Sequence, residues 1–149
     1  MLGKNTMKPL VLFCALSTVV VAAVAPSMSD QEVSRRLLGT WASDPAADSF
    51  FVTTVTYKED GTGTEIVFPR GETESAGVKV TTSWFVREGI LTIKSTASSD
   101  PSKIPVGVEI KDRIISISDG SFTFEAYDGY GSATGKRETR VRKMTAGNQ

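Results

Sequence analysis

The side chains able to carry out catalysis are few in this 149-residue sequence, which contains no histidine and a single cysteine, Cys14. Ser-His-Asp and Cys-His arrangements need an imidazole as the general base, so both are excluded. The commonest zinc ligand is also missing, and no EF-hand spacing occurs, so we expect no metal site. Residues 129–135 hold three glycines but match neither the G-x-G-x-x-G nor the Walker pattern. We interpret them as a flexible connection between strands.

Carboxylates remain as candidate acids and bases. Asp60, Asp119 and Asp128 each precede a glycine, a placement typical of turns. Glu125 lies in an expected strand, on the face opposite its neighbouring phenylalanines, where we expect it to be solvated. The sequence therefore predicts a protein that is not an enzyme and that uses no cofactor.

The N-terminal segment has the order of a secretory signal peptide. Lys4 and Lys8 precede an apolar run over residues 10–25, which ends in small residues. We expect a signal over about residues 1–25 and a secreted or periplasmic protein. An uncleaved membrane anchor over 10–25 is the alternative, although a spanning helix needs about 20 apolar residues. Cys14 is interpreted as an apolar member of this run.

The charge of the remaining chain is nearly balanced. The sequence holds 17 basic and 17 acidic residues, and two of the basic ones, Lys4 and Lys8, belong to the expected signal. Nucleic-acid binding needs a basic stripe that displaces counterions, so no nucleic-acid partner is expected. The same balance gives no reason to expect contact with an anionic membrane.

The elements that must position these side chains are almost all strands. One short helix is expected from about Glu32 to Leu38, capped by Ser29 or Asp30. Segments of alternating polarity predict strands over 50–57, 64–68, 78–87, 90–94, 106–110, 114–118, 122–127 and 137–143. Lys111-Asp112 is interpreted as a turn between two of them. Short turns at this spacing favour an antiparallel meander, closed as a barrel or folded as a sandwich.

A motif after the helix connects this pattern to a known family. Leu38-Gly39-Thr40-Trp41 resembles the first signature of the lipocalin superfamily and its small bacterial lipocalin-like relatives. A strand bearing Trp84, the Asp-Gly turns at 60–61 and 119–120 and an arginine in the final strand fit the same pattern. The resemblance implies an all-β, antiparallel up-and-down barrel of about eight strands over residues 37–144. Residues 26–36 would form a short linker and helix, and residues 145–149 a flexible tail.

The resemblance also implies how one end of the barrel is closed. In lipocalins the tryptophan of this motif packs under an arginine from the last strand, a cation–π contact worth about 0.5–2 kcal/mol. Here the structural closure would consist of Gly39 and Trp41 with either Arg140 or Arg142. The two arginines share one face of the strand, and we prefer Arg140.

The function implied by the resemblance is the binding of a small, largely apolar ligand at the open end. The candidate lining residues are Tyr57, Trp84, Phe122, Phe124 and Tyr127, although Tyr127 lies on the face opposite Phe122. A barrel of this size can also be packed solid. The alternative is therefore a protein-interaction, inhibitor or envelope module that contacts its partner through loops 69–77 and 95–104. Phe85, on a polar face, is interpreted as a singly exposed aromatic residue.

Overall fold

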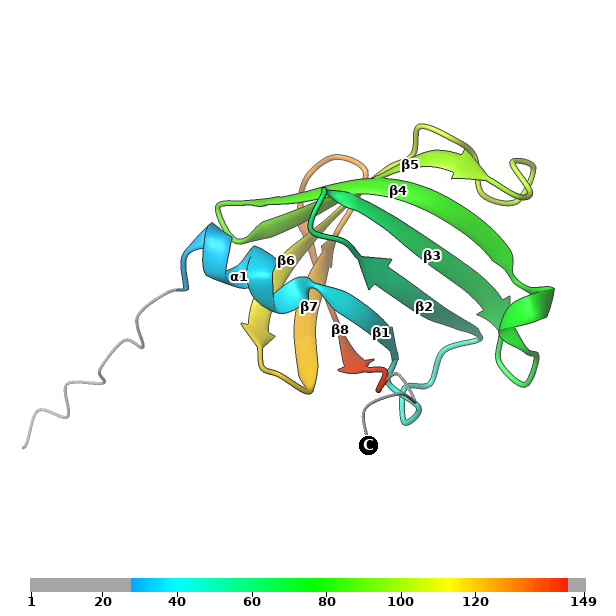
Figure 1. Cartoon of the computed structure of the whole chain (residues 1–149), viewed down its shortest axis with the longest axis horizontal. Coiled ribbons are helices and arrows are strands. Elements are labelled where there is room, and N and C mark those ends of the chain that lie inside the picture. Colours follow the sequence, from blue (N-terminus) through cyan, green and yellow to red (C-terminus); the bar gives the residue numbers. More distant parts are fainter. Residues whose placement is uncertain (1–27, 145–149) are drawn as a thin grey trace, which may run out of the picture.

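A computed structural model describes residues 28–144, which form one α-helix, one short 3-10 helix and eight antiparallel strands closed into a barrel (Figure 1). The expected signal peptide over 1–25 and the expected tail over 145–149 lie outside these residues. Within residues 28–144, the helices are too short and too polar to cross a membrane.

Each strand pairs with its neighbour in the sequence, and the last strand pairs with the first. The fold class expected from the sequence is therefore confirmed as an up-and-down barrel, and the sandwich is ruled out. The elements are α1 (Asp30–Leu37), β1 (Gly39–Ser43), β2 (Phe51–Tyr57), β3 (Thr62–Pro69), η1 (Glu74–Ala76), β4 (Val78–Arg87), β5 (Ile90–Ser98), β6 (Glu109–Ile117), β7 (Ser121–Tyr127) and β8 (Ala133–Arg142).

The helix α1 is fixed by two side chains at its start. Ser29, rather than Asp30, is the N-cap, and its hydroxyl accepts a hydrogen bond from the Glu32 N–H at 3.2 Å. The Asp30 carboxylate instead accepts the N–H groups of Glu88 and Gly89 at 2.7 and 2.9 Å. Since these two residues form the β4–β5 turn, Asp30 ties the helix to one end of the barrel (Figure 1).

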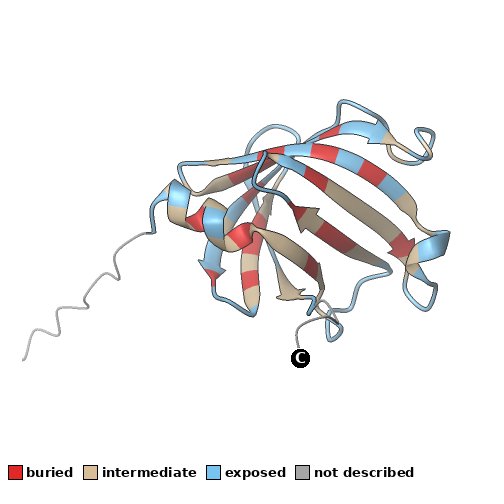
Figure 2. Ribbon diagram, viewed as in Figure 1, coloured by how far each residue is buried: buried red, intermediate tan, exposed pale blue. Residues whose placement is uncertain are grey.

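The hydrophobic core fills the half of the barrel next to α1. Its members come from the inward face of nearly every strand and from α1: Val33, Leu37, Trp41, Val55, Tyr57, Trp84, Leu91, Ile93, Ile117, Phe122 and Phe124. Buried and exposed residues alternate along β4 (Figure 2), as period-2 patterning predicts for a strand with one solvated face. Phe85 is exposed on that outer face.

The expected turn at Lys111-Asp112 is wrong, because β6 continues through it without interruption. Both of its neighbours pair with this segment, with Leu91 of β5 and Ala126 of β7 opposite Asp112. A backbone paired on both sides cannot turn there. Residues 109–110 of one expected strand and 114–117 of the next therefore belong to the single strand β6, and Asp112 lies on its inward face. Residues 106–108 precede β6.

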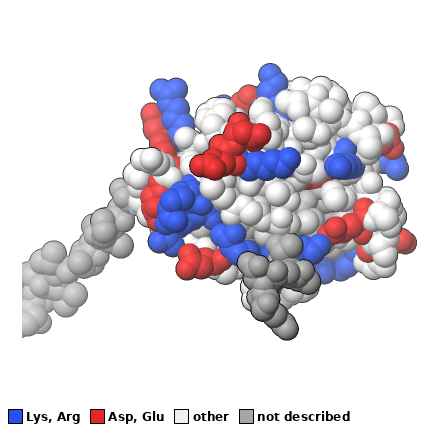
Figure 3. Space-filling model, in the orientation of Figure 1, with Lys and Arg blue, Asp and Glu red and all other residues white. Residues whose placement is uncertain are grey.

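The antiparallel order gives the barrel two different ends. The β2–β3, β4–β5 and β6–β7 turns gather with α1 at one end, which we call the closed end. The longer connections over 44–50, 70–77, 99–108 and 128–132 lie at the other, the open end. On the face shown in Figure 3, acidic and basic side chains are interspersed.

Candidate functional site

The closed end is sealed by an arginine over a tryptophan. The guanidinium carbon of Arg142 lies 4.0 Å from the centroid of the Trp41 ring. Trp41 is completely buried, and its indole N–H donates to the Leu37 carbonyl at 2.7 Å. This contact is the closure implied by the lipocalin resemblance, but the arginine is Arg142 and not Arg140. The register explains why, since Arg142 pairs directly with Trp41, whereas Arg140 pairs with Ser43, further toward the open end.

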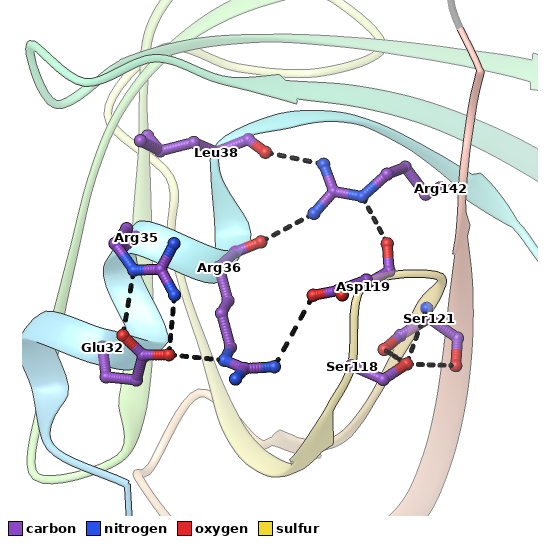
Figure 4. A network of polar contacts seen from close by, with 8 residues as sticks. All are labelled: Glu32, Arg35, Arg36, Leu38, Ser118, Asp119, Ser121 and Arg142. Atoms are coloured by element: carbon purple, nitrogen blue, oxygen red, sulfur yellow. Dashed lines mark hydrogen bonds and ion pairs between the residues drawn. The ribbon is translucent and has the colours of Figure 1, made fainter.

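Arg142 also binds three backbone carbonyls (Figure 4). Its Nε donates to Asp119 at 2.6 Å, Nη1 to Leu38 at 2.8 Å and Nη2 to Arg36 at 2.9 Å. Gly39 leaves space for the Arg142 guanidinium, because a Cβ at this position would lie 2.7 Å from Arg142 Nη1. The φ of Gly39, +110°, also disfavours any other residue. The contacts join α1, the β6–β7 turn and β8 at the closed end.

Charged side chains occupy the inward face nearer the open end. Residues opposite each other in a ladder share a face, and this rule places the charges inside. Glu65 is opposite the buried residues Val55 and Val80. Asp112 is opposite buried Leu91.

The last strand adds one further charge to this interior. Arg140 is opposite buried Phe122, and Glu138 is opposite buried Phe124. The guanidinium carbon of Arg140 lies 5.6 Å from the centroid of the Phe124 ring. We call Glu65, Asp112 and Arg140 the interior polar cluster; the Glu138 side chain is 45% exposed and lies outside it. Of the three, only Arg140 was predicted to lie inside the barrel, and in a different role.

Burial changes the protonation of this cluster. Removal from water raises the pKa of Asp112 to about 7, and the positive charge of Arg140 opposes this rise. Burial likewise raises the pKa of Glu65, again against the influence of Arg140. The pKa of Tyr57 is also raised by burial, so its phenol keeps its proton. Asp112 and Glu65 therefore hold a proton more readily than exposed carboxyl groups do.

One hydrogen-bonding nitrogen of the Arg140 guanidinium has no partner within residues 28–144. This atom, Nη1, is buried. Glu138, its neighbour on β8, instead pairs with Lys136 at 2.7 Å. Thr82 Oγ1 is a second buried atom without a partner in the described residues. Such groups usually have partners, because burying a polar atom without one costs about 1–3 kcal/mol.

A pocket of about 450 Å³ reaches this cluster from the open end. It lies between the β1–β2 loop and β8, and its walls include Ser43, Phe51, Thr53, Glu138 and Arg140. This volume falls within the range of small-molecule sites. The arrangement can bind a polar group at Arg140 and an apolar group against Phe51.

Four of the five residues predicted to line a ligand site come together, as parts of the hydrophobic core rather than as walls of the pocket of about 450 Å³. Tyr57, Trp84, Phe122 and Phe124 belong to the packed core. The rings of Tyr57 and Trp84 meet edge to face with centroids 5.1 Å apart. Tyr127 lies elsewhere, after a register shift in β7, and borders a second hollow of about 510 Å³ at the β7–β8 loop.

The two loops predicted to contact a partner are both at the open end. Residues 69–77 contain η1, and residues 95–98 of the other loop belong to β5 rather than to a loop. Phe50 and Phe51 are exposed beside the first of these loops, where the Phe50 carbonyl accepts the Arg70 N–H, and their ring centroids lie 4.9 Å apart. In the described part of the chain, no three His, Cys, Asp or Glu side chains gather in a way that could hold a metal ion.

Comparison with known proteins gives a similarity of fold alone. No protein-family model and no curated protein matches the sequence. Among solved structures, the chain is similar to the 1.79 Å crystal structure of a lipocalin-like protein from Bacteroides uniformis ATCC 8492. The TM-score is 0.47 and the identity 14%, over 73% of this chain and 99% of that chain. The assignment of the barrel rests on the strand pairing described above.

Proposed function

We propose that this lipocalin-like barrel is an exported, non-catalytic binding protein that holds a small ligand in its open half. The observation that carries the proposal is the pocket of about 450 Å³ that leads from the open end to Arg140. The pocket joins one aromatic wall residue, Phe51, to several polar groups, and a concave site with convergent polar groups is typical of small-molecule binding. The closed end is tied by Arg142, so a ligand would enter and leave between the loops of the open end.

The ligand that fits this site has both an apolar and a polar part. The sequence suggested a largely apolar ligand, and Phe51 and Phe124 offer apolar surface at the pocket and beneath Arg140. A wholly apolar ligand, however, would leave Arg140 Nη1 without an acceptor, at a cost of about 1–3 kcal/mol. We therefore propose a small amphipathic ligand with its polar end near Arg140.

Binding is tested by titrating the protein with fatty acids, retinoids and haem. Calorimetry and tryptophan fluorescence measure the binding in each titration. Thr53→Trp places a bulky ring in the pocket wall and is expected to weaken binding of any ligand held there. Thr81→Trp is the matched control, since Thr81 is exposed on the outer face of β4. Binding that survives Thr53→Trp, or no binding of any of these compounds, would contradict the proposal.

A second candidate function is that of a protein-interaction or envelope module. It is favoured by the exposed Phe50–Phe51 pair beside the open-end loops, because exposed aromatic residues are enriched at interfaces. The test is capture of a partner from the native compartment. If the wild type and Thr53→Trp capture a partner and Phe50→Ser does not, the result favours this function over ligand binding.

A further inference from the structure

We infer that the inner end of the ligand is an anionic group bound by Arg140, which lines the pocket and has a buried Nη1 atom without an acceptor within residues 28–144. The inference rests on the proposed binding function and names the ligand chemistry of the same site.

The first argument is the state of Arg140. Its guanidinium lies inside the barrel wall over Phe124, with one face against an aromatic ring. Its Nη1 atom is buried and has no acceptor within residues 28–144. A guanidinium is always charged and offers a planar set of donors that suits carboxylates and similar anions. The group that would satisfy this donor is therefore a hydrogen-bond acceptor, and a negatively charged acceptor forms the strongest bond.

The second argument is that, within residues 28–144, no carboxyl group lies within ion-pair distance of Arg140. Glu138 pairs with Lys136. Glu65 and Asp112 have their pKa values raised by burial, so at neutral pH each binds a proton more readily than an exposed carboxyl group does. The positive charge of Arg140 thus remains available.

The test uses three compounds with one skeleton and different ends: 4-phenylbutyrate, 4-phenylbutanol and 4-phenylbutylammonium. Binding to the whole protein is measured by calorimetry at pH 7. We expect 4-phenylbutyrate to bind at least about tenfold more tightly than the other two, the effect of one charge-assisted hydrogen bond.

Two variants test the role of Arg140. Arg140→Met should abolish the preference for 4-phenylbutyrate, whereas Arg87→Met, at an exposed arginine on β4, should keep it.

The outcomes that overturn the inference differ from those that overturn the proposed function. Equal binding of the acid and the alcohol would refute the anionic ligand and leave the binding function standing, and so would tighter binding of the ammonium compound. Binding of none of the three compounds would refute the inference and the proposed function together.

Discussion

Replacement of Arg142 by methionine should destabilise the barrel strongly while keeping most of the length of the side chain. The change removes three hydrogen bonds to backbone carbonyls at 2.6–2.9 Å and the cation–π contact with Trp41. A partly buried hydrogen bond from a charged group contributes about 1 kcal/mol, and a cation–π contact about 0.5–1 kcal/mol. The expected loss is therefore about 3–4 kcal/mol, a large part of the total stability of a domain of this size.

Urea unfolding followed by tryptophan fluorescence measures this loss, because Trp41 lies directly beneath the substituted side chain. Arg142→Lys keeps a positive charge without the planar fork, and we expect it to recover about half of the loss. Arg87→Met is the control for removing a surface charge and should change stability by less than about 0.5 kcal/mol. A loss below about 1 kcal/mol for Arg142→Met would show that the closed end is held by apolar packing alone.

Three further substitutions test other parts of the structure. Gly63→Ala should cost about 1–3 kcal/mol in a urea titration, because the new Cβ would lie 2.7 Å from Thr82 Oγ1; full stability would mean that β3 can shift locally. Asp30→Asn weakens the attachment of α1 to the Gly89 turn and should cost about 1 kcal/mol. Hydrogen exchange at the Gly89 N–H should then accelerate, and unchanged exchange would refute the attachment. Asp112 has a pKa of about 7 in the folded protein, against an ordinary value of 3.8. Between these two values the folded protein holds a proton that the unfolded chain has lost, so stability should fall as pH rises from about 4 to 7. Asp112→Asn should remove this fall and be more stable than the wild type at pH 8 by up to about 4 kcal/mol, which thermal unfolding at pH 5 and pH 8 would check.

The barrel could be predicted because its strands and turns are indicated by short stretches of sequence. Alternation along residues 78–87 identifies a strand with one inward face, and β4 follows this pattern. The Gly39-x-Trp41 motif predicted the closure, and Ser29 was one of two predicted caps. The strand and the cap depend on residues that are close together in the sequence, whereas the closure was expected only from the resemblance of the motif to lipocalins.

The interior polar cluster could not be predicted in the same way, because it depends on register. Asp112 looked like a turn residue beside Lys111, and only pairing with both β5 and β7 shows that it lies in a strand. Arg140 and Arg142 share a face of β8, and a two-residue step decides which one meets Trp41. A one-residue error in register exchanges the inner and outer faces, so such assignments need the neighbouring strands.

The hydrogen bonds of Arg142 have a consequence for the order in which the chain folds. The guanidinium reaches carbonyls 104 and 106 positions earlier in the sequence, at Leu38 and Arg36. Each hairpin can form from nearby residues as it emerges during synthesis, but β1 has no second neighbour until β8 arrives. A nascent chain stopped short of residue 140 would expose two unpaired strand edges, which are templates for association with other chains. Completion of the barrel therefore waits until residues 140–142 of β8 have been synthesised.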